Sequence, residues 1–383
     1  MQTNIFIPTC WMFLALTSTA LAQRTWVVDA ANGPGTDFTE IAPALTAASD
    51  GDVLRVRAGD YRPWTTSKGV ALLGDPGAVI HLGIVEVCAV RNLGAGQRFV
   101  LRGFQFVEDY PLNGADSYFE ATQCKGSVHL ESLVEGAWRK AFAKFDHCDF
   151  VTVAHHASSR RFDVVSCRVT MHDVNITAGT VDFALPSPAL GLRDSYVEIT
   201  ECVLRGAIGN SYVAPSPAII ATSSAIELRG SKNSSIAGGI LRQVHAPAIR
   251  ADATSTLRID PRVTIVGSID GGVVTRERMI ALEVGGGLLS TSKIYDVVAP
   301  AGDFVVIFGA LPAPSLRTPI GELWLDLASL YVVGAAQIGA SGMWQITTPI
   351  PSNPSLRGVV LAYQVLDIGN AIDLSNAAVV ILR

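Results

Sequence analysis

The sequence predicts an all-β protein: a right-handed parallel β-helix with a short N-terminal capping helix, followed by a small antiparallel β-sandwich. Three observations lead to this fold class. A segment repeats in the middle of the chain, short β-branched runs alternate with turn residues from about Arg55 to Gly267, and the residue composition and pattern change after Gly267. Self-similarity of this kind is typical of a solenoid, in which one coil buries its apolar face only by stacking on the next.

The repeat is clearest in residues 187–199 and 216–228, and a third copy follows one coil later in residues 247–250 and 255–259. Five positions of the first two copies agree in order: Ser187 with Ser216, Leu190 with Ile219, Ser195 with Ser224, Val197 with Ile226, and Glu198 with Glu227. Aligned positions of successive coils are therefore expected to lie on top of one another, about 4.8 Å apart.

Residues 1–22 are predicted to be a signal peptide. An apolar run at residues 11–16 leads to Ala20 and Ala22, which form the small-x-small pattern that signal peptidase accepts. The mature chain would begin near Gln23 and would be secreted, either extracellular or at the cell surface. No later segment has the ~18 uninterrupted apolar residues of a transmembrane helix, so no membrane span is expected.

The passage that follows predicts a cap for the solenoid. Residues 37–49 are expected to form a brief amphipathic helix, with Asp37 and Glu40 at capping-box spacing and Ile41, Ala44 and Leu45 on one face. Residues 50–61 then form a turn, an alternating strand and a glycine corner. A cap is physically required, because an uncovered end coil leaves apolar core and unpaired strand edges in water.

This opening resembles that of pectin-lyase-like β-helix proteins, pectinesterases among them. The resemblance lies in the order of residues 37–41, 44–45, 50–52, 53–56 and 59–61. It implies that the helix covers the N-terminal end of the solenoid and that the strand begins the first coil. The coil pattern beyond it is general to the superfamily.

Five cysteines remain once Cys10 leaves with the signal peptide: Cys88, Cys124, Cys148, Cys167 and Cys202. None shows CxxC or metal-finger spacing, and several sit beside strand-like triplets at the same place in successive coils. One interpretation is an internal ladder of small buried side chains. The other is disulfides between neighbouring coils, which export would favour.

The C-terminal part has a different composition from the repeats. Gly285 to Gly287 suggests a linker, and the rest is nearly free of Lys and Glu, with β-branched runs separated by Pro and Gly turns. Short, evenly spaced strands of this kind predict an antiparallel sandwich, similar to modules appended to secreted bacterial proteins. The predicted organisation is a signal peptide (1–22), a β-helix (23–283) and a β-sandwich (284–383).

Composition and charge exclude some partners. The net charge of -5 argues against nucleic acid or an anionic membrane as the main partner, and 49% hydrophobic residues provide for a large core. Phosphate-binding loops, GxSxG, HExxH and EF-hand motifs are absent from the sequence. No cofactor is expected, apart from Ca²⁺ in one of the functions considered below.

Ionisable residues gather in one region, since five of the seven histidines lie between His129 and His172. Strand alternation there places Ser166, Arg168, Thr170 and His172 on the outer side. The weak catalytic candidates are Asp146, His147, Asp149, His155, Arg160, Arg168 and His172. Three interpretations stay open: a solvated face with weak ion pairs, a sugar-binding groove, or a catalytic site.

Known chemistries of the superfamily can be compared with these residues. The pectinesterase and polygalacturonase signatures are missing beyond the opening. A polysaccharide lyase needs a base near the uronate C5 and a cation, either Ca²⁺ or arginine. Arg160 or Arg168 with His155 or His172 would suit this, and Asp146 and Asp149 are weak Ca²⁺ candidates.

The sequence therefore favours a secreted module that binds polysaccharide or a cell-surface glycan, without turnover. The alternative is a carbohydrate-active enzyme, most plausibly a lyase on uronic-acid polymers, with pectinesterase a more remote one. A third hypothesis is a purely structural adhesin or spike, which would form trimers and have no sugar-sized groove.

Overall fold

The computed structural model describes residues 23–83, 85–109, 117–135, 141–179, 187–209, 214–230, 234–285, 287–369 and 371–383. The predicted signal peptide, residues 1–22, lies outside the described residues. No helix among the described residues is long and apolar enough to cross a membrane.

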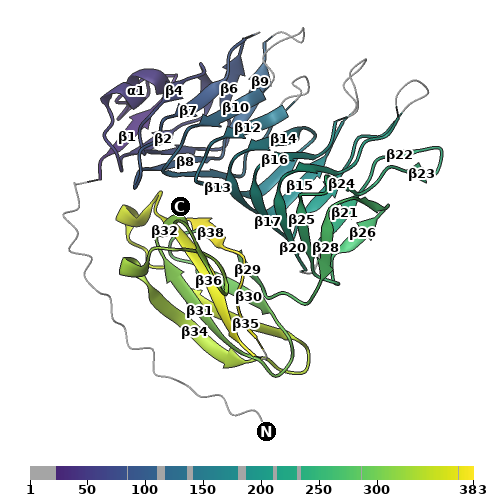
Figure 1. Cartoon of the computed structure of the whole chain (residues 1–383). Coiled ribbons are helices and arrows are strands. Elements are labelled where there is room, and N and C mark those ends of the chain that lie inside the picture. Colours follow the sequence, from purple (N-terminus) through teal and green to yellow (C-terminus); the bar gives the residue numbers. More distant parts are fainter. Residues whose placement is uncertain are drawn as a thin grey trace.

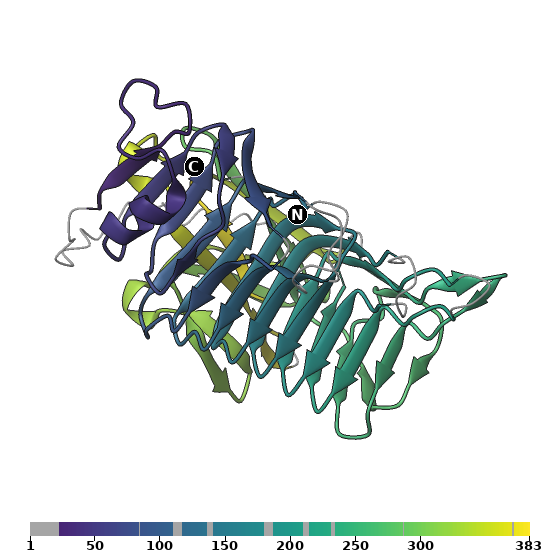
Figure 2. The same cartoon turned by 90° about the horizontal axis from the view of Figure 1, so that it is seen from above.

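Most of the chain forms a right-handed parallel β-helix, as predicted (Figures 1 and 2). One face, called here the main sheet, stacks strands from eleven successive passes of the chain in parallel. They are β1 (Thr25–Val28), β2 (Val53–Val56), β5 (Ala71–Gly74), β8 (Arg98–Arg102), β11 (Ser127–Glu131), β13 (Phe150–Ser158), β15 (Arg168–Thr177), β17 (Tyr196–Thr200), β20 (Ala225–Arg229), β25 (Thr256–Ile259) and β28 (Val273–Arg276).

Two further faces complete each coil. The second sheet consists of β4 (Thr65–Thr66), β7 (Cys88–Arg91), β10 (Ser117–Thr122), β12 (Ala141–Asp146), β14 (Arg161–Val165), β16 (Leu190–Arg193), β19 (Ile219–Thr222), β24 (Ile249–Ala251) and β27 (Ile269–Asp270). The third face contains β3 (Gly59–Tyr61), β6 (Ala78–Leu82), β9 (Gln105–Glu108), the ends of β13 and β15, β18 (Val203–Arg205), β21 (Ser235–Ala237) and β26 (Thr264–Val266). A hairpin, β22 (Ile240–Leu241) and β23 (Val244–His245), projects near the end of the solenoid.

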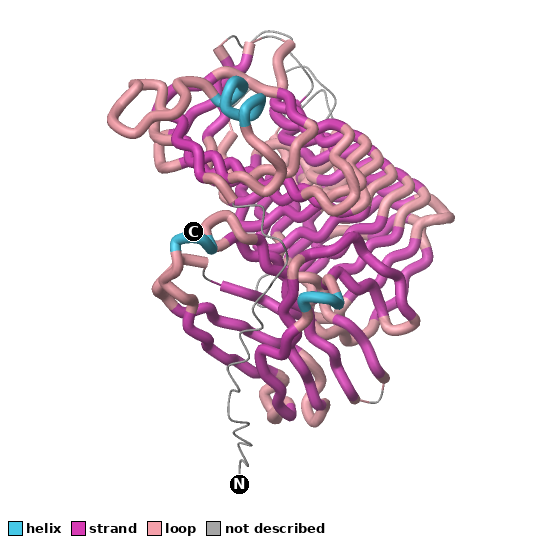
Figure 3. The backbone as a smooth tube through the Cα atoms, turned by 90° about the vertical axis from the view of Figure 1, so that its left-hand side faces the viewer, coloured by secondary structure: helices cyan, strands magenta, loops and turns pink. Residues whose placement is uncertain are grey.

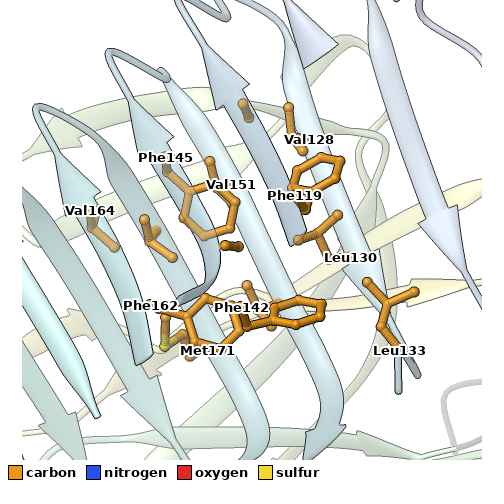
Figure 4. Packing of buried hydrophobic residues seen from close by; sticks show 14 of the residues in the cluster. Phe119, Val128, Leu130, Leu133, Phe142, Phe145, Val151, Phe162, Val164 and Met171 are labelled. Carbon is orange, nitrogen blue, oxygen red and sulfur yellow. The ribbon is translucent and has the colours of Figure 1, made fainter. Parts of the chain in front are cut away.

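The register confirms the repeat alignment that the sequence predicts. Leu190 pairs with Ile219, and Glu198 pairs with Glu227. Inward side chains stack in columns between the faces: the rings of Phe145 and Phe162 lie 6.1 Å apart, and those of Phe142 and Phe162 5.3 Å apart (Figure 4). Burial of this apolar column is the main force that holds successive coils in register.

The N-terminal cap has the predicted form, but not the predicted capping box. Helix α1 (Ile41–Ala47) buries Ile41, Ala44 and Leu45 against the first coil. Its N-cap, Glu40, makes no side-chain capping hydrogen bond, and the Asp37 carboxylate instead accepts from the backbone N–H of Val27 at 2.8 Å. Because the Asp37 carboxylate bonds to strand β1 and not to the helix, the helix is positioned by its contact with the end coil.

The five cysteines are free and buried, and three of them form part of a ladder at one corner of the coils. The backbone N–H of Cys148 donates to Sγ of Cys167 at 3.1 Å, and that of Cys167 donates to Oγ of Ser195 at 3.2 Å. Ser224 and Ser255 continue the ladder in the next two coils. Each small side chain satisfies a backbone N–H of the coil before it, which explains why a cysteine or a serine occupies this position.

The C-terminal part is an antiparallel β-sandwich, as predicted. One sheet contains β29 (Ala281–Gly285), β30 (Ser292–Val298) and β35 (Met343–Pro349). The other contains β34 (Tyr331–Gln337), β31 (Phe304–Ala310), β36 (Val360–Ile368), β37 (Ile372–Leu374) and β38 (Ala378–Ile381), with a separate hairpin of β32 (Pro312–Thr318) and β33 (Gly321–Leu325). The 3-10 helices η1 (Leu327–Ser329) and η2 (Pro354–Leu356) lie in its loops. The predicted domain boundary between residues 283 and 284 falls within β29, which pairs along its whole length with β30.

The sandwich packs against the outer face of the main sheet (Figures 1 and 3). One apolar cluster joins Val53, Val100 and Phe150 of the β-helix to Trp324 and Val360 of the sandwich. The rings of Phe150 and Trp324 lie 4.5 Å apart. This contact decides which surfaces of the solenoid remain open to solvent.

Candidate functional site

The outer face of the main sheet is where alternation predicts the ligand-facing residues, and the structure covers most of it. Thr170 and His172 point outward as predicted, but both are buried, and the sandwich contacts Thr170. The hydroxyl of Thr170 donates to the carbonyl of Ala377 in the sandwich at 3.1 Å. This part of the predicted strip is therefore an interdomain contact, since outward on a solenoid does not mean exposed when a second domain packs there.

The buried histidines are poor candidates for acid–base chemistry in this arrangement. Burial lowers the pKa of His172 to about 4, and its Nε2 lies 4.0 Å from a carboxylate oxygen of Glu201. Burial also lowers the pKa of His129 well below its usual range and that of His156 to about 4. His129 contacts the hydroxyls of Thr152 and Ser127, so its role is to satisfy buried polar groups.

His155 stays partly exposed and lies where β13 leaves the main sheet. Its Nδ1 lies 2.8 Å from a carboxylate oxygen of Asp173, and this hydrogen bond raises the pKa of His155 and lowers that of Asp173. Both residues occupy left-handed corner positions of neighbouring coils, with φ of 48° and 50°. The pair is an ion pair at a coil corner.

Three other candidates, Asp146, His147 and Arg160, do not come together in one site. Asp146 and His147 form an exposed pair, with 2.7 Å between Oδ1 and Nδ1. Arg160 is buried at the end of the third face, and its Nε has no hydrogen-bond partner among the described residues. The solvated-face interpretation fits Asp146 and His147 best.

A polar hollow of about 280 Å³ lies at the corner where the second sheet turns into the main sheet. We call it the corner groove. It is lined by Cys148, Asp149, Ser166, Cys167, Arg168, Asp194, Ser195, Tyr196, Ser223 and Ala225. Two of the sequence-predicted candidates, Asp149 and Arg168, are among these residues.

A repeated triplet builds the corner groove. In three successive coils a residue in the left-handed conformation is followed by the buried ladder cysteine or serine and then by the first residue of the main-sheet strand. The left-handed positions at the groove are Ser166, Asp194 and Ser223, with φ of 51°, 49° and 49°. Because successive coils are about 4.8 Å apart, these polar side chains form an evenly spaced row along the solenoid.

The charges of the corner groove are unequal. Arg168 is held by the sandwich, since its Nη1 donates to Oγ of Ser315 at 2.6 Å and to Oε2 of Glu322 at 2.5 Å. The carboxylates of Asp149 and Asp194 have no hydrogen bond or ion pair in the part of the chain that the structure describes. The groove therefore offers two unpaired acids, and its one cation is already engaged.

The structure separates the residues that a lyase would need together. Asp149 and Arg168 lie where the main-sheet strands begin, and His155 and His172 lie where they end. Asp149 and His155 are six positions apart along the strand, which at ~3.3 Å for each position is roughly 20 Å. An arginine that neutralises a uronate and a histidine that removes its C5 proton would have to be a few ångströms apart.

Among the described residues, no group of three or more His, Cys, Asp or Glu side chains could hold a metal ion. The two weak Ca²⁺ candidates also differ in their surroundings. Asp146 pairs with His147, and Asp149 lies in the corner groove.

The sequence interpretation missed Asp194, Tyr196 and Ser223 as groove residues. A signal for them was present, because Ser195 and Ser224 are aligned repeat positions and their neighbours must share one corner. What the repeat does not show is that the sandwich leaves this corner open while it covers the rest of the sheet.

No protein-family model matches this chain, and no curated protein sequence matches it. Two similar solved structures are tailspike proteins. The enzymatically active domain of tailspike protein 2 of bacteriophage CBA120 has a TM-score of 0.39 and 8% sequence identity, over 84% of this chain and 69% of that one. The full-length tailspike protein 2 of an Escherichia coli O157:H7 bacteriophage has a TM-score of 0.30 and 8% identity, over 84% and 62%. Similarity at this level carries no information on function.

Proposed function

We propose that this protein is a secreted or cell-surface β-helix protein that binds polysaccharide in the corner groove, without turnover. The observation that carries the proposal is the groove itself, an open polar hollow lined by side chains that recur once per coil. Row spacing of about 4.8 Å suits an extended chain ligand whose hydroxyls recur along its length. Tyr196 adds an aromatic ring, and Ser166 and Ser223 add hydroxyls.

The charge of the corner groove narrows the class of glycan. Asp149 and Asp194 are unpaired acids, whereas Arg168 is engaged by Glu322. A uronic-acid polymer would meet like charge there, which disfavours binding. A neutral or amino-bearing glycan fits better, so the uronan lyase is the weaker alternative. It also lacks a base beside its arginine.

The binding test is a substitution that fills the groove. Asp149→Trp is expected to reduce the affinity for a neutral β-glucan or chitosan oligosaccharide at least tenfold, because the indole occupies the hollow and one unpaired acid is lost. Asp270→Trp, at an exposed site on the last coil, is the matched control and should bind like the parent. Isothermal titration calorimetry measures both, and equal affinity of the two variants would exclude the groove as the site.

Turnover is tested on the parent chain with several uronans. We expect no unsaturated product by absorbance. Product formation that is lost in Arg168→Ala or His172→Ala would instead establish the lyase.

Export is tested separately. The proposal that the chain is secreted predicts that N-terminal sequencing of the exported protein starts near Gln23.

A further inference from the structure

Two side chains of the corner groove are held through the interface between the β-helix and the sandwich. Arg168 is bonded to Ser315 and Glu322 of the sandwich. The hydroxyl of Tyr196 donates to Oε1 of Glu198 at 2.8 Å, and Oε2 of Glu198 accepts the backbone N–H of Ala377 in the sandwich at 3.4 Å. Docking of the sandwich therefore fixes both groove residues.

Glu198 lies at the centre of a charged network buried in this interface. It is 0% exposed, and the guanidinium of Arg229, 1% exposed, lies 3.8 Å away. Arg229 also binds Glu227 at 2.5 Å and donates to the carbonyl of Ile280, where the chain enters the sandwich, at 2.9 Å. The sandwich thus covers the charges of Glu198 and Arg229, which become solvated if the sandwich separates from the β-helix.

The charges near Glu198 come from strands β20 and β25 and from the sandwich, whose strand β29 contacts β17 and carries the buried Glu283. Strand β20 contributes Glu227 and Arg229, and β25 contributes Arg258, which binds Glu227 at 2.7 Å and Glu277 at 2.7 Å. From the sandwich, Asp373 lies 3.9 Å from Arg258. Tyr196 is the remaining titratable neighbour. The two arginines are shared among four carboxylates, so one of these carboxylates is readily protonated.

We propose that the sandwich is a proton-linked lid that opens more often as the pH rises to neutral, and that each opening frees Arg168 and changes the charge that the corner groove presents. The part of this inference that concerns ligands rests on the proposed function. In the docked state the groove shows two free acids. In the released state Arg168 becomes available to an anionic saccharide.

The direction of the linkage follows from the burial of Glu198. Burial raises its pKa to about 7, with partial opposition from Arg229, and burial also raises the pKa of Asp373. A released Glu198 in water would titrate near its ordinary value of about 4.3. The docked state therefore binds the extra proton, and docking weakens as pH rises from about 4.5 to about 7. Glu227, whose pKa the two arginines lower, acts in the opposite sense only in more acidic solution.

Hydrogen exchange tests the lid without any ligand. At pH 8.5 the backbone amide of Ala377 is expected to lose about thirtyfold in protection relative to pH 5.5, after correction for intrinsic rates. The variant Glu198→Gln mimics the protonated side chain and should show protection that does not depend on pH. Asp270→Asn, which changes an exposed carboxylate outside this network, should behave like the parent.

Binding gives the second readout, with a galacturonan oligosaccharide as probe. Its affinity is expected to rise at least fivefold from pH 5.5 to 8.5 in the parent, but not in Glu198→Gln or Arg168→Ala. If opening depends on pH but no glycan binds, the lid proposal stands and the proposed function is overturned. If glycan binds but the protection of Ala377 is equal at both pH values, the proposed function stands and the lid proposal is overturned. The parent pH series decides this even if a variant does not fold.

Discussion

Trp324→Ala is expected to release the sandwich from the β-helix and to lower the free energy of unfolding by ~3–5 kcal/mol. Trp324 is fully buried, and its ring packs against that of Phe150 at a tilt and lies 6.4 Å from that of Tyr196. It is the largest side chain in the apolar cluster between the two domains. Its removal leaves a cavity at the contact that holds them together. Denaturant unfolding measures the loss, and small-angle X-ray scattering measures the release as an increased radius of gyration.

The control for this prediction is Trp344→Ala. Trp344 packs on the sandwich's own core and not on the β-helix, so its loss should destabilise the sandwich without lifting it from the main sheet. An unchanged radius of gyration in Trp324→Ala, at full solubility, would mean that the apolar cluster does not hold the domains together.

Arg229→Ala is expected to cost ~3–5 kcal/mol at pH 8, because it leaves Glu198 and Glu227 buried without their shared cation. The loss should be smaller at pH 5. Glu198 already has its pKa raised to about 7 by burial, and removal of the arginine raises it further, so at pH 5 it is protonated and uncharged. Thermal or denaturant unfolding at the two pH values measures the difference.

Arg250→Ala provides the comparison, since this arginine is exposed on the second sheet and should change stability by less than ~0.5 kcal/mol. The double variant Arg229→Met with Glu198→Gln should recover part of the loss at pH 8. Equal destabilisation of Arg229→Ala at both pH values would contradict the assignment of a buried, unpaired charge as the cause.

The fold was predictable because it depends on local alternation and on repetition along the chain. Leu190 and Ile219, or Glu198 and Glu227, occupy equivalent positions in the sequence and pair in the structure. The predicted capping box was wrong, since the Asp37 carboxylate accepts from Val27 on β1 and not from the helix. That contact depends on where the end coil lies, which the local sequence pattern does not include. The resemblance to pectin-lyase-like proteins stays a prediction beyond the β-helix itself.

The candidate site was predictable only in part. Alternation placed Arg168, Thr170 and His172 on one outer face, and all three do point away from the core of the β-helix. Their surroundings differ, because Arg168 borders an open groove, whereas Thr170 and His172 are buried. Density of His, Asp and Arg along the chain was a poor guide to a site, since these residues lie at opposite ends of the same strands.

By itself, the sequence determined the stacking of the coils and the face to which each side chain points. Both follow from a two-residue alternation and a repeat, which are local properties of the chain. Only the tertiary structure decided which outward residues meet water, because that depends on where the sandwich packs. Trp324 and Phe150 are more than a hundred positions apart in the sequence and touch in the structure. Glu198 and Arg229 are buried where the sandwich meets the β-helix. No periodic pattern along the chain records contacts of that kind.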